Sequence, residues 1–222
     1  MESPRRVQIF ARTGCLVAEL KGVAVALWES DGELFDLVKR ELFTGVVGDV
    51  MERFGLLRQF LPPQIRPLRD NMVLIGRAMP ALEVPVFGEA DGSGANPIMA
   101  RPQGLVFESI DALQPNDVYI CYSRDTREIR QLGFPCFSRG SYAQDQGRRA
   151  KVMDYRVPVQ IGDAYIRPGD IIFGDVDGVC VVPREAEEQT FNTAFQSVGN
   201  EDAMKQALLN GMSLVEAVRK HS

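Results

Sequence analysis

The side chains that could do chemistry in this 222-residue chain are limited, because its one histidine is His221, the penultimate residue. Chain ends are usually mobile, so we do not expect a histidine-based triad or a zinc site built on several histidines. Catalysis would instead use carboxylates, arginines, backbone amides, water and a divalent metal that prefers oxygen ligands. Arginine and aspartate residues are therefore the first candidates for a site.

Two groups of residues have suitable types and spacing. Arg124 and Asp125 stand directly before a short helix predicted over residues 126–132, and an acidic residue there also has a structural explanation, since it stabilises a helix N-terminus. Asp170, Asp175 and Asp177 have the spacing of metal ligands, but they lie in Pro-Gly-Asp and Asp-Val-Asp-Gly sequences. Aspartate side chains hydrogen-bond to backbone amides in such turns, so we predict turn roles for these three.

Composition excludes several classes of partner and location. The net charge of −5 provides no basic surface for the phosphate backbone, so no nucleic acid is expected as a partner. No apolar run reaches 18 residues, so no membrane-spanning segment is expected. No Cys-x-x-Cys pair occurs, which predicts buried, reduced thiols and a cytoplasmic protein; the cysteines are Cys15, Cys121, Cys136 and Cys180.

The N-terminal half combines an uncertain start with a helical segment. Residues 1–30 are interpreted as an N-terminal extension that carries no secretory signal. Apolar residues at helical spacing predict helix over 33–54, with Thr44 capping a second helix that ends at Gly55. Three prolines predict a loop over residues 61–70, and the pattern then changes to two short strands within 72–87.

The rest of the chain is predicted to be mainly strands, with helices at its end. A loop over 88–104 precedes a strand at 117–121, a buried strand at 134–137 and a run of short strands over 151–183. Amphipathic helices are predicted from Glu185 to Phe195 and from Asp202 to Val218. We therefore predict one α/β sandwich domain over residues 31–222, with helices at both ends of the chain.

Three segments then resemble one known family. Residues 122–137 contain the Arg-Asp pair, the short helix and a Gly-Phe-Pro-Cys-Phe strand, and residues 158–170 and 174–183 contain the Pro-Gly-Asp and Asp-Gly turns. Their order and spacing resemble the RraA-like family, which comprises the 4-hydroxy-4-methyl-2-oxoglutarate (HMG) aldolases and their non-catalytic relatives. The resemblance covers residues 33–219 and implies a swivelling-type α/β/β sandwich that assembles as a homotrimer or hexamer.

The resemblance also implies roles for the Arg-Asp pair. Arg124 would be the catalytic residue that binds the keto-acid end of a small 2-oxo acid substrate, and a planar guanidinium suits a carboxylate. Asp125 would be the second catalytic residue and would hold a divalent metal, Mg²⁺ or alternatively Mn²⁺, largely through water. The implied reaction is cleavage of a 4-hydroxy-2-oxo dicarboxylic acid to pyruvate and a second oxo acid, with oxaloacetate decarboxylation as a side activity.

The chain departs from the family pattern before the Arg-Asp pair. A glycine-led helix start, which offers backbone amides to the substrate carboxylate in full-length relatives, is missing between the strand at 117–121 and Arg124. The acidic position of the active members falls at Gln103, so a replacement acid would come from a neighbouring subunit or from one of Glu83, Glu89, Asp91 and Glu108. A non-catalytic regulator of a protein such as RNase E, or an inactive truncated paralogue, therefore remains an alternative to the aldolase.

Overall fold

The computed structural model describes residues 27–86, 97–120, 135–140 and 149–221, together with Gln131 and Gly133. The helices are α1 (Asp31–Glu41), α2 (Thr44–Arg53), α3 (Val106–Asp111), the 3-10 helix η1 (Arg184–Ala186), α5 (Glu187–Leu209) and α6 (Leu214–His221). The strands are β1 (Arg66–Pro67), β2 (Leu74–Pro85), β3 (Asp117–Ile120), β4 (Phe137–Ser138), β5 (Ala150–Tyr155), β6 (Val159–Ile161), β7 (Ala164–Ile166), β8 (Ile171–Asp175) and β9 (Gly178–Val182).

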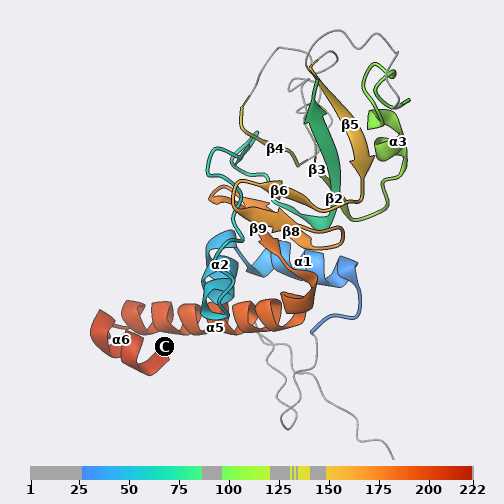
Figure 1. The fold of residues 1–222 in the computed structure, drawn as a ribbon. Coiled ribbons are helices and arrows are strands. Elements are labelled where there is room, and N and C mark those ends of the chain that lie inside the picture. Colours follow the sequence, from blue (N-terminus) through green and yellow to red (C-terminus); the bar gives the residue numbers. More distant parts are fainter. Residues whose placement is uncertain are drawn as a thin grey trace, which may run out of the picture.

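The long strand β2 organises the sheets (Figure 1). Its first residues pair antiparallel with β8, its middle pairs parallel with β3, and its last residues pair antiparallel with β5. A register shift between Leu82 and Glu83 interrupts the pairing with β5. β9 extends the sheet beyond β8, and β6 and β7 form a separate hairpin. β2 thus connects the part of the molecule that contains β3, β5 and α3 to the part that contains α1, α2 and α5.

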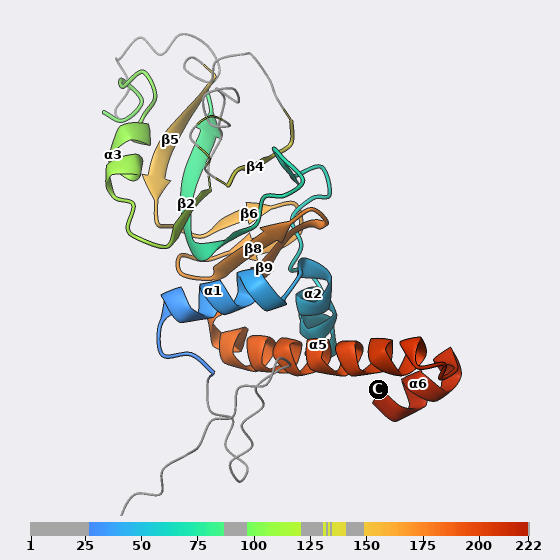
Figure 2. The same ribbon diagram turned by 180° about the vertical axis from the view of Figure 1, so that it is seen from behind.

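Strands β8 and β9 are buried on both faces. Ile171, Phe173 and Cys180 face a core that includes residues of α1, α2 and α5, whereas Ile172 and Val181 face a second core that includes residues of β6 and β7. Successive strand residues point to opposite faces, so burial of both faces explains the continuous apolar runs here. Figures 1 and 2 show α1, α2 and α5 below this sheet, as a sandwich requires.

The helices predicted over residues 33–54 are confirmed as α1 and α2. Ser30 caps the N-terminus of α1, because its Oγ accepts a hydrogen bond from the Glu33 amide at 3.3 Å. Gly55, with a φ of +78°, follows the end of α2, as predicted. The cap assigned to Thr44 is wrong: Phe43 occupies the cap position without a side-chain hydrogen bond, and Thr44 is instead bonded to Asp175.

Three further expectations need correction. The two strands predicted within 72–87 are the single strand β2, because its successive parts pair with different neighbours. Of the described residues of the buried strand predicted at 134–137, Phe137 alone lies in a strand, and it is half-buried. The break predicted between Phe195 and Asp202 is absent, because helix α5 continues through Gly199. Val198 packs on the core and helps offset the roughly 1 kcal/mol cost of a helical glycine.

Helix α3 was not predicted. The predicted position of the break between the last two helices was wrong. The break falls after Leu209, where Gly211 has a φ of +90°, and α6 follows it. The strand at 117–121 and the strands and turns of 151–183 are confirmed by β3 and by β5 to β9. No helix in the described part of the chain is long and apolar enough to cross a membrane.

The cysteines in the described residues are free thiols. Cys180 is fully buried in β9, and burial raises the pKa of its thiol well above the usual range. Cys136 is half-buried, and burial raises the pKa of its thiol too. Both groups are therefore poor nucleophiles at neutral pH, in agreement with the predicted structural role. Cys15 and Cys121 lie outside the described residues.

Candidate functional site

The carboxyl end of β3 is the described point nearest in sequence to the predicted catalytic pair. β3 runs parallel to β2 with Asp117 beside Arg77 and Ile120 beside Pro80, and β2 continues past this point to Pro85. Ligands commonly bind at the carboxyl ends of parallel strands. Arg124 and Asp125 follow β3 directly in the sequence, but they lie outside the described residues, as does most of the helix predicted over 126–132.

Arg156 holds β3 in place. Its Nη2 donates to the Ala112 carbonyl at 2.8 Å and to Asp117 Oδ2 at 2.6 Å, and its backbone N–H donates to the Pro80 carbonyl at 2.8 Å. Its φ is +55°, a left-handed conformation that costs a residue other than glycine about 1–2 kcal/mol. These contacts offset that cost and join the start of β3 to the end of α3 and to β2.

A hydroxyl pair joins α3 to β3. The Tyr119 hydroxyl and Ser109 Oγ are 2.6 Å apart, and Ser109 Oγ donates to the Val106 carbonyl at 2.7 Å. Because the single serine proton goes to Val106, the tyrosine hydroxyl is the donor in the Tyr119–Ser109 bond. Ser109 is fully buried, so both groups have the partner that burial requires.

Position 103, where the family signature has an acid, lies against β5. The Gln103 carbonyl accepts a hydrogen bond from the Val152 amide at 3.3 Å, and the Leu105 amide donates to the Val152 carbonyl at 2.8 Å. Gly104 between them has a φ of +68°, and a Cβ there would lie 2.1 Å from the Val152 carbonyl oxygen. The backbone of this segment is therefore closely fitted to β5, and Gln103 is an amide at the position where the sequence resemblance implied an acid.

The acids predicted as substitutes differ in their surroundings. Glu108 on α3 is exposed and paired with Arg101. Glu83 lies on β2 beyond the residues that pair with β3, and both of its carboxylate oxygens are buried. Glu89 and Asp91 lie outside the described residues. Of the two acids that the structure describes, Glu83 is thus the one with a buried carboxylate.

Lys151 is a buried cation that sequence reasoning missed. Its residue is 4% exposed, and its Nζ donates to the carbonyl oxygens of Met99 and Arg101, the latter at 2.5 Å. Carbonyl dipoles compensate part of the cost of burying an ammonium group. This lysine fixes the segment before Gln103 to β5. An Ala-Lys-Val sequence in a strand contains no signal for such a role.

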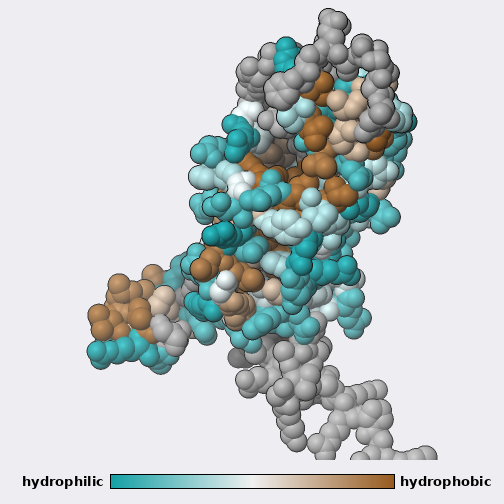
Figure 3. Space-filling view, in the orientation of Figure 1, coloured by the Kyte–Doolittle hydropathy of each residue, from teal (hydrophilic) through white to brown (hydrophobic). Residues whose placement is uncertain are grey.

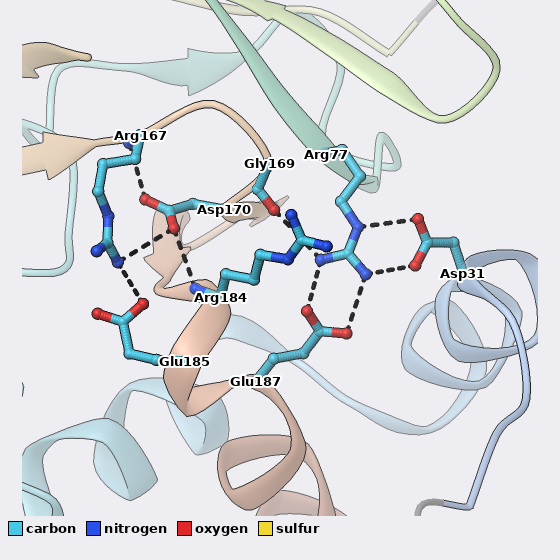
Figure 4. Close-up of polar contacts among 8 residues, drawn as sticks. All are labelled: Asp31, Arg77, Arg167, Gly169, Asp170, Arg184, Glu185 and Glu187. Atoms are coloured by element: carbon cyan, nitrogen blue, oxygen red, sulfur yellow. Dashed lines mark hydrogen bonds and ion pairs between the residues drawn. The ribbon is translucent and has the colours of Figure 1, made fainter. Parts of the chain in front are cut away.

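Arg77 on β2 is the centre of a charged cluster (Figure 4). Its Nε and Nη2 donate to the Asp31 carboxylate, with a distance of 2.8 Å from Nε to Asp31 Oδ2. Its Nη1 and Nη2 donate to the Glu187 carboxylate, with a distance of 2.5 Å from Nη1 to Glu187 Oε2. Its Nη1 also donates to the Gly169 carbonyl at 3.3 Å. Asp31 above all raises the pKa of Arg77, and the same bond lowers the pKa of Asp31. The cluster joins α1, β2 and α5.

An open pocket of about 350 Å³ lies beside this cluster, lined by Arg167, Pro168, Asp170, Arg184 and Glu185. Asp170 is 2% exposed and accepts hydrogen bonds from the backbone amides of Arg167 at 2.8 Å and Arg184 at 3.0 Å. Glu185 accepts from Arg167 Nη2. Both carboxylates of the pocket are thus used within the protein, and the predicted turn role of Asp170 is confirmed.

Asp175 is also a structural residue. It accepts hydrogen bonds from the Thr44 amide and hydroxyl, each at 2.7 Å, and from the Asp177 amide at 2.9 Å. The Asp175 carboxylate lies against Thr44, the first residue of α2, and a negative charge is favourable at a helix N-terminus. Across the ranges that the structure describes, no group of three or more His, Cys, Asp or Glu side chains could hold a metal ion.

This arrangement predicts a stability effect. Asp175→Ala should lower the free energy of unfolding by about 2–4 kcal/mol, because it leaves the buried donors of Thr44 without an acceptor. Urea denaturation measures this change. Asp177→Ala is the matched control, since that side chain is exposed and should change stability by less than about 0.5 kcal/mol. Equal stabilities of the two variants would contradict the assignment.

Comparisons with known proteins agree with this fold and motif. Residues 121–181 match the model of the RraA-like family, described as Aldolase/RraA. The chain is 33% identical over 94 residues to a Halalkalibacterium halodurans protein named "Putative 4-hydroxy-4-methyl-2-oxoglutarate aldolase", a match that covers 42% of this chain and 44% of that protein. It is 32% identical over 94 residues to Protein DlpA of Legionella pneumophila, a match that covers 42% of this chain and 15% of that protein. These matches span less than half the length of either relative.

Solved structures share the overall fold. A crystal structure described as "novel cellulases from microbes associated with the gut ecosystem" is 27% identical, with a TM-score of 0.68 over 81% of this chain and 90% of that one. An uncharacterised Pseudomonas syringae protein is 20% identical, with a TM-score of 0.67 over 92% of this chain and 99% of that one. Streptomyces coelicolor RraAS2, described as an unusual member of the RNase ES inhibitor RraA protein family, is also 20% identical, with a TM-score of 0.61 over 75% of this chain and 93% of that one. At this identity both structures show the fold alone. The predicted resemblance to the RraA-like family is confirmed by the match over residues 121–181 and by the relative from Halalkalibacterium halodurans. The predicted α/β fold is confirmed by the solved structures.

Proposed function

We propose that this protein is a divalent-metal-dependent aldolase or lyase that cleaves a 4-hydroxy-2-oxo dicarboxylic acid, of the HMG type, to pyruvate and a second oxo acid. The observation that carries the proposal is the RraA-like match over residues 121–181, which contains Arg124 and Asp125 directly after the carboxyl end of β3. The relative from Halalkalibacterium halodurans, with its name as an HMG aldolase, supports the same reaction.

The proposed reaction breaks one carbon–carbon bond. The 4-hydroxyl loses its proton, the C3–C4 bond breaks, and its electron pair passes to the enolate of pyruvate, which then takes up a proton at C3. Arg124 would bind the carboxylate next to the 2-oxo group bidentately and hold the developing enolate beside it. Decarboxylation of oxaloacetate passes through the same enolate, so we propose it as a side activity.

The proposal includes a divalent metal, which Asp125 would hold. Mg²⁺ keeps several water ligands and needs few carboxylates, so one or two acids suffice for it. Asp170 and Asp175 are engaged in turn and helix contacts, and no group of three or more His, Cys, Asp or Glu side chains among the described residues could hold a metal ion. We assign no step to the metal. We propose Glu83, a half-buried residue of β2 past the end of β3 with a buried carboxylate, as the acid that replaces the one missing at Gln103.

One observation favours a second function, that of a non-catalytic protein that binds a protein partner. Gln103 stands where the active members have an acid, and its segment is fixed on β5 by backbone hydrogen bonds. Streptomyces coelicolor RraAS2, described as a member of an RNase ES inhibitor family, has the same fold. An inactive truncated paralogue would share the substitution, and it would bind no metal and no partner.

An assay with oxaloacetate and with HMG, each with and without Mg²⁺, tests the proposal. We expect turnover above that of buffer plus Mg²⁺, lost on chelation. Mg²⁺ or Mn²⁺ should also raise the melting temperature, and pyruvate or oxalate should enlarge that rise, because ligands that bind the folded state stabilise it. Absence of both the turnover and the ligand-dependent shift contradicts the aldolase and leaves the binding protein and the inactive truncated paralogue.

A further inference from the structure

Two residues other than glycine have a left-handed backbone in the described part of the chain, and both adjoin the start of β3. Asn116, with a φ of +71°, directly precedes the strand, and Arg156, with a φ of +55°, donates from its side chain to Asp117. Asparagine adopts this conformation more readily than arginine, which does so where the surrounding structure fixes it. Because such positions cluster at functional sites, the start of β3 is a candidate for a functional role.

A close backbone contact fixes β3 against β2 at the same point. The Arg77 amide donates to the Asn116 carbonyl at 2.7 Å. A Cβ on Gly76 would lie 2.8 Å from Cγ2 of Val118, and closer still to the Asn116 carbonyl oxygen. Only glycine therefore fits at this position of β2, and the approach of the two strands depends on it.

Apolar packing supports this part of the molecule less than the two cores support β8 and β9. Neither core includes a described residue of β5 or α3. Figure 3 shows apolar side chains (brown) at the surface in this region, where Leu82 is 40% exposed and Phe107 is 66% exposed. Segments with few buried apolar contacts open more easily. The placement of β3 relative to β5 and α3 therefore depends on polar contacts such as those of Arg156.

Arg156 joins these elements through one nitrogen. The residue directly follows β5, and its Nη2 donates both to the carbonyl of Ala112, just after α3, and to the carboxylate of Asp117, the first residue of β3. The Asp117 side chain is 8% exposed and also accepts from the Gln114 amide at 2.9 Å. Lysine has three donors on one nitrogen, so it could make the same two bonds.

We propose that Arg156 is a positioning residue for the reaction. It fixes the start of β3 and, through this short strand, the Arg124–Asp125 pair that follows it in the sequence; the inference rests on the proposed aldolase function. Among the described residues β3 pairs with β2 alone, over four residues, so a shift at its start is carried to its carboxyl end. Displacing a catalytic group by about 1 Å can lower a rate on the order of 10².

Metal-dependent oxaloacetate decarboxylation by variants of the full-length chain tests the proposal. Arg156→Gly removes the guanidinium and relieves the left-handed backbone, so its melting temperature should stay close to the natural one while kcat falls by about 10². Arg156→Asn, which also tolerates this backbone, should behave alike. Arg156→Lys should restore most of the rate, because it keeps both bonds. Arg40→Met, which removes an arginine from the surface of α1, is the control and should keep the natural rate.

Hydrogen exchange provides a readout that does not use the activity. The amides of β3 should exchange faster in Arg156→Gly than in the natural chain, whereas those of β8 should be unchanged. The inference alone is overturned if Arg156→Gly keeps the natural rate, if the exchange of β3 is unchanged, or if Arg156→Lys is as slow as Arg156→Gly. A natural chain without turnover removes the proposed function, and this inference with it, before any variant is compared.

Discussion

Replacing Asp125 with alanine should abolish metal-dependent oxaloacetate decarboxylation, because the proposed metal site then loses its carboxylate. Arg124→Lys should lower kcat/KM by about 10²–10³, since an ammonium group cannot reproduce the bidentate contact of a guanidinium with a carboxylate. Asp125→Ala should also remove the rise in melting temperature caused by Mg²⁺. The decarboxylation rate is followed by loss of oxaloacetate absorbance, against buffer plus Mg²⁺ as background.

Asp163→Ala is the matched control, because Asp163 is exposed in the turn between β6 and β7. This variant should keep the natural rate. If Asp125→Ala also keeps it, the reaction takes place at another site. If the natural chain has no rate above background, the aldolase proposal fails for this protein, and the binding-protein or inactive-paralogue alternative replaces it.

Local turn chemistry made the β5 to β9 region predictable. Gly162, Gly169 and Gly178 all have positive φ, and each lies in a turn that the sequence indicates. The continuity of α5 could not be predicted in the same way. Its middle is polar and contains Gly199, and the helix continues because Val198 packs on a core built from α1, α2 and β8, which are distant in the sequence.

The roles of charged residues could be predicted only where their partners lie close in the sequence. The turn role of Asp170 was predicted, because its main partners lie in its own turn and at the start of η1. The role of Arg77 was not, since its two carboxylates are 46 and 110 residues away in the sequence. Lys151 likewise bonds to carbonyls 50 and 52 residues away. The roles of Arg124 and Asp125 stay predictions, because they rest on motif resemblance and lie outside the described residues.

The Arg77 cluster should be the most sensitive point for stability. Arg77→Met should lower the free energy of unfolding by about 2–4 kcal/mol, because it leaves the carboxylates of Asp31 and Glu187 close together without their shared cation. The effect stays below the full cost of a deeply buried pair, since the Asp31 side chain is 37% exposed. Urea denaturation at pH 7 measures it. Arg40→Met is the control, because Arg40 pairs with Glu41 at the surface and should contribute little.

The same cluster predicts how stability depends on pH. Arg77 lowers the pKa of Asp31 in the folded state below its value of about 3.9 in unfolded chains. The folded state therefore binds fewer protons than the unfolded state in acid, so this contribution is present above pH 4 and is lost as the pH falls through the lowered pKa. The stability difference between the natural chain and Arg77→Met should therefore shrink from pH 7 to pH 3. A difference that stays constant or grows towards acid would show that the Arg77–Asp31 pair does not contribute as its geometry indicates.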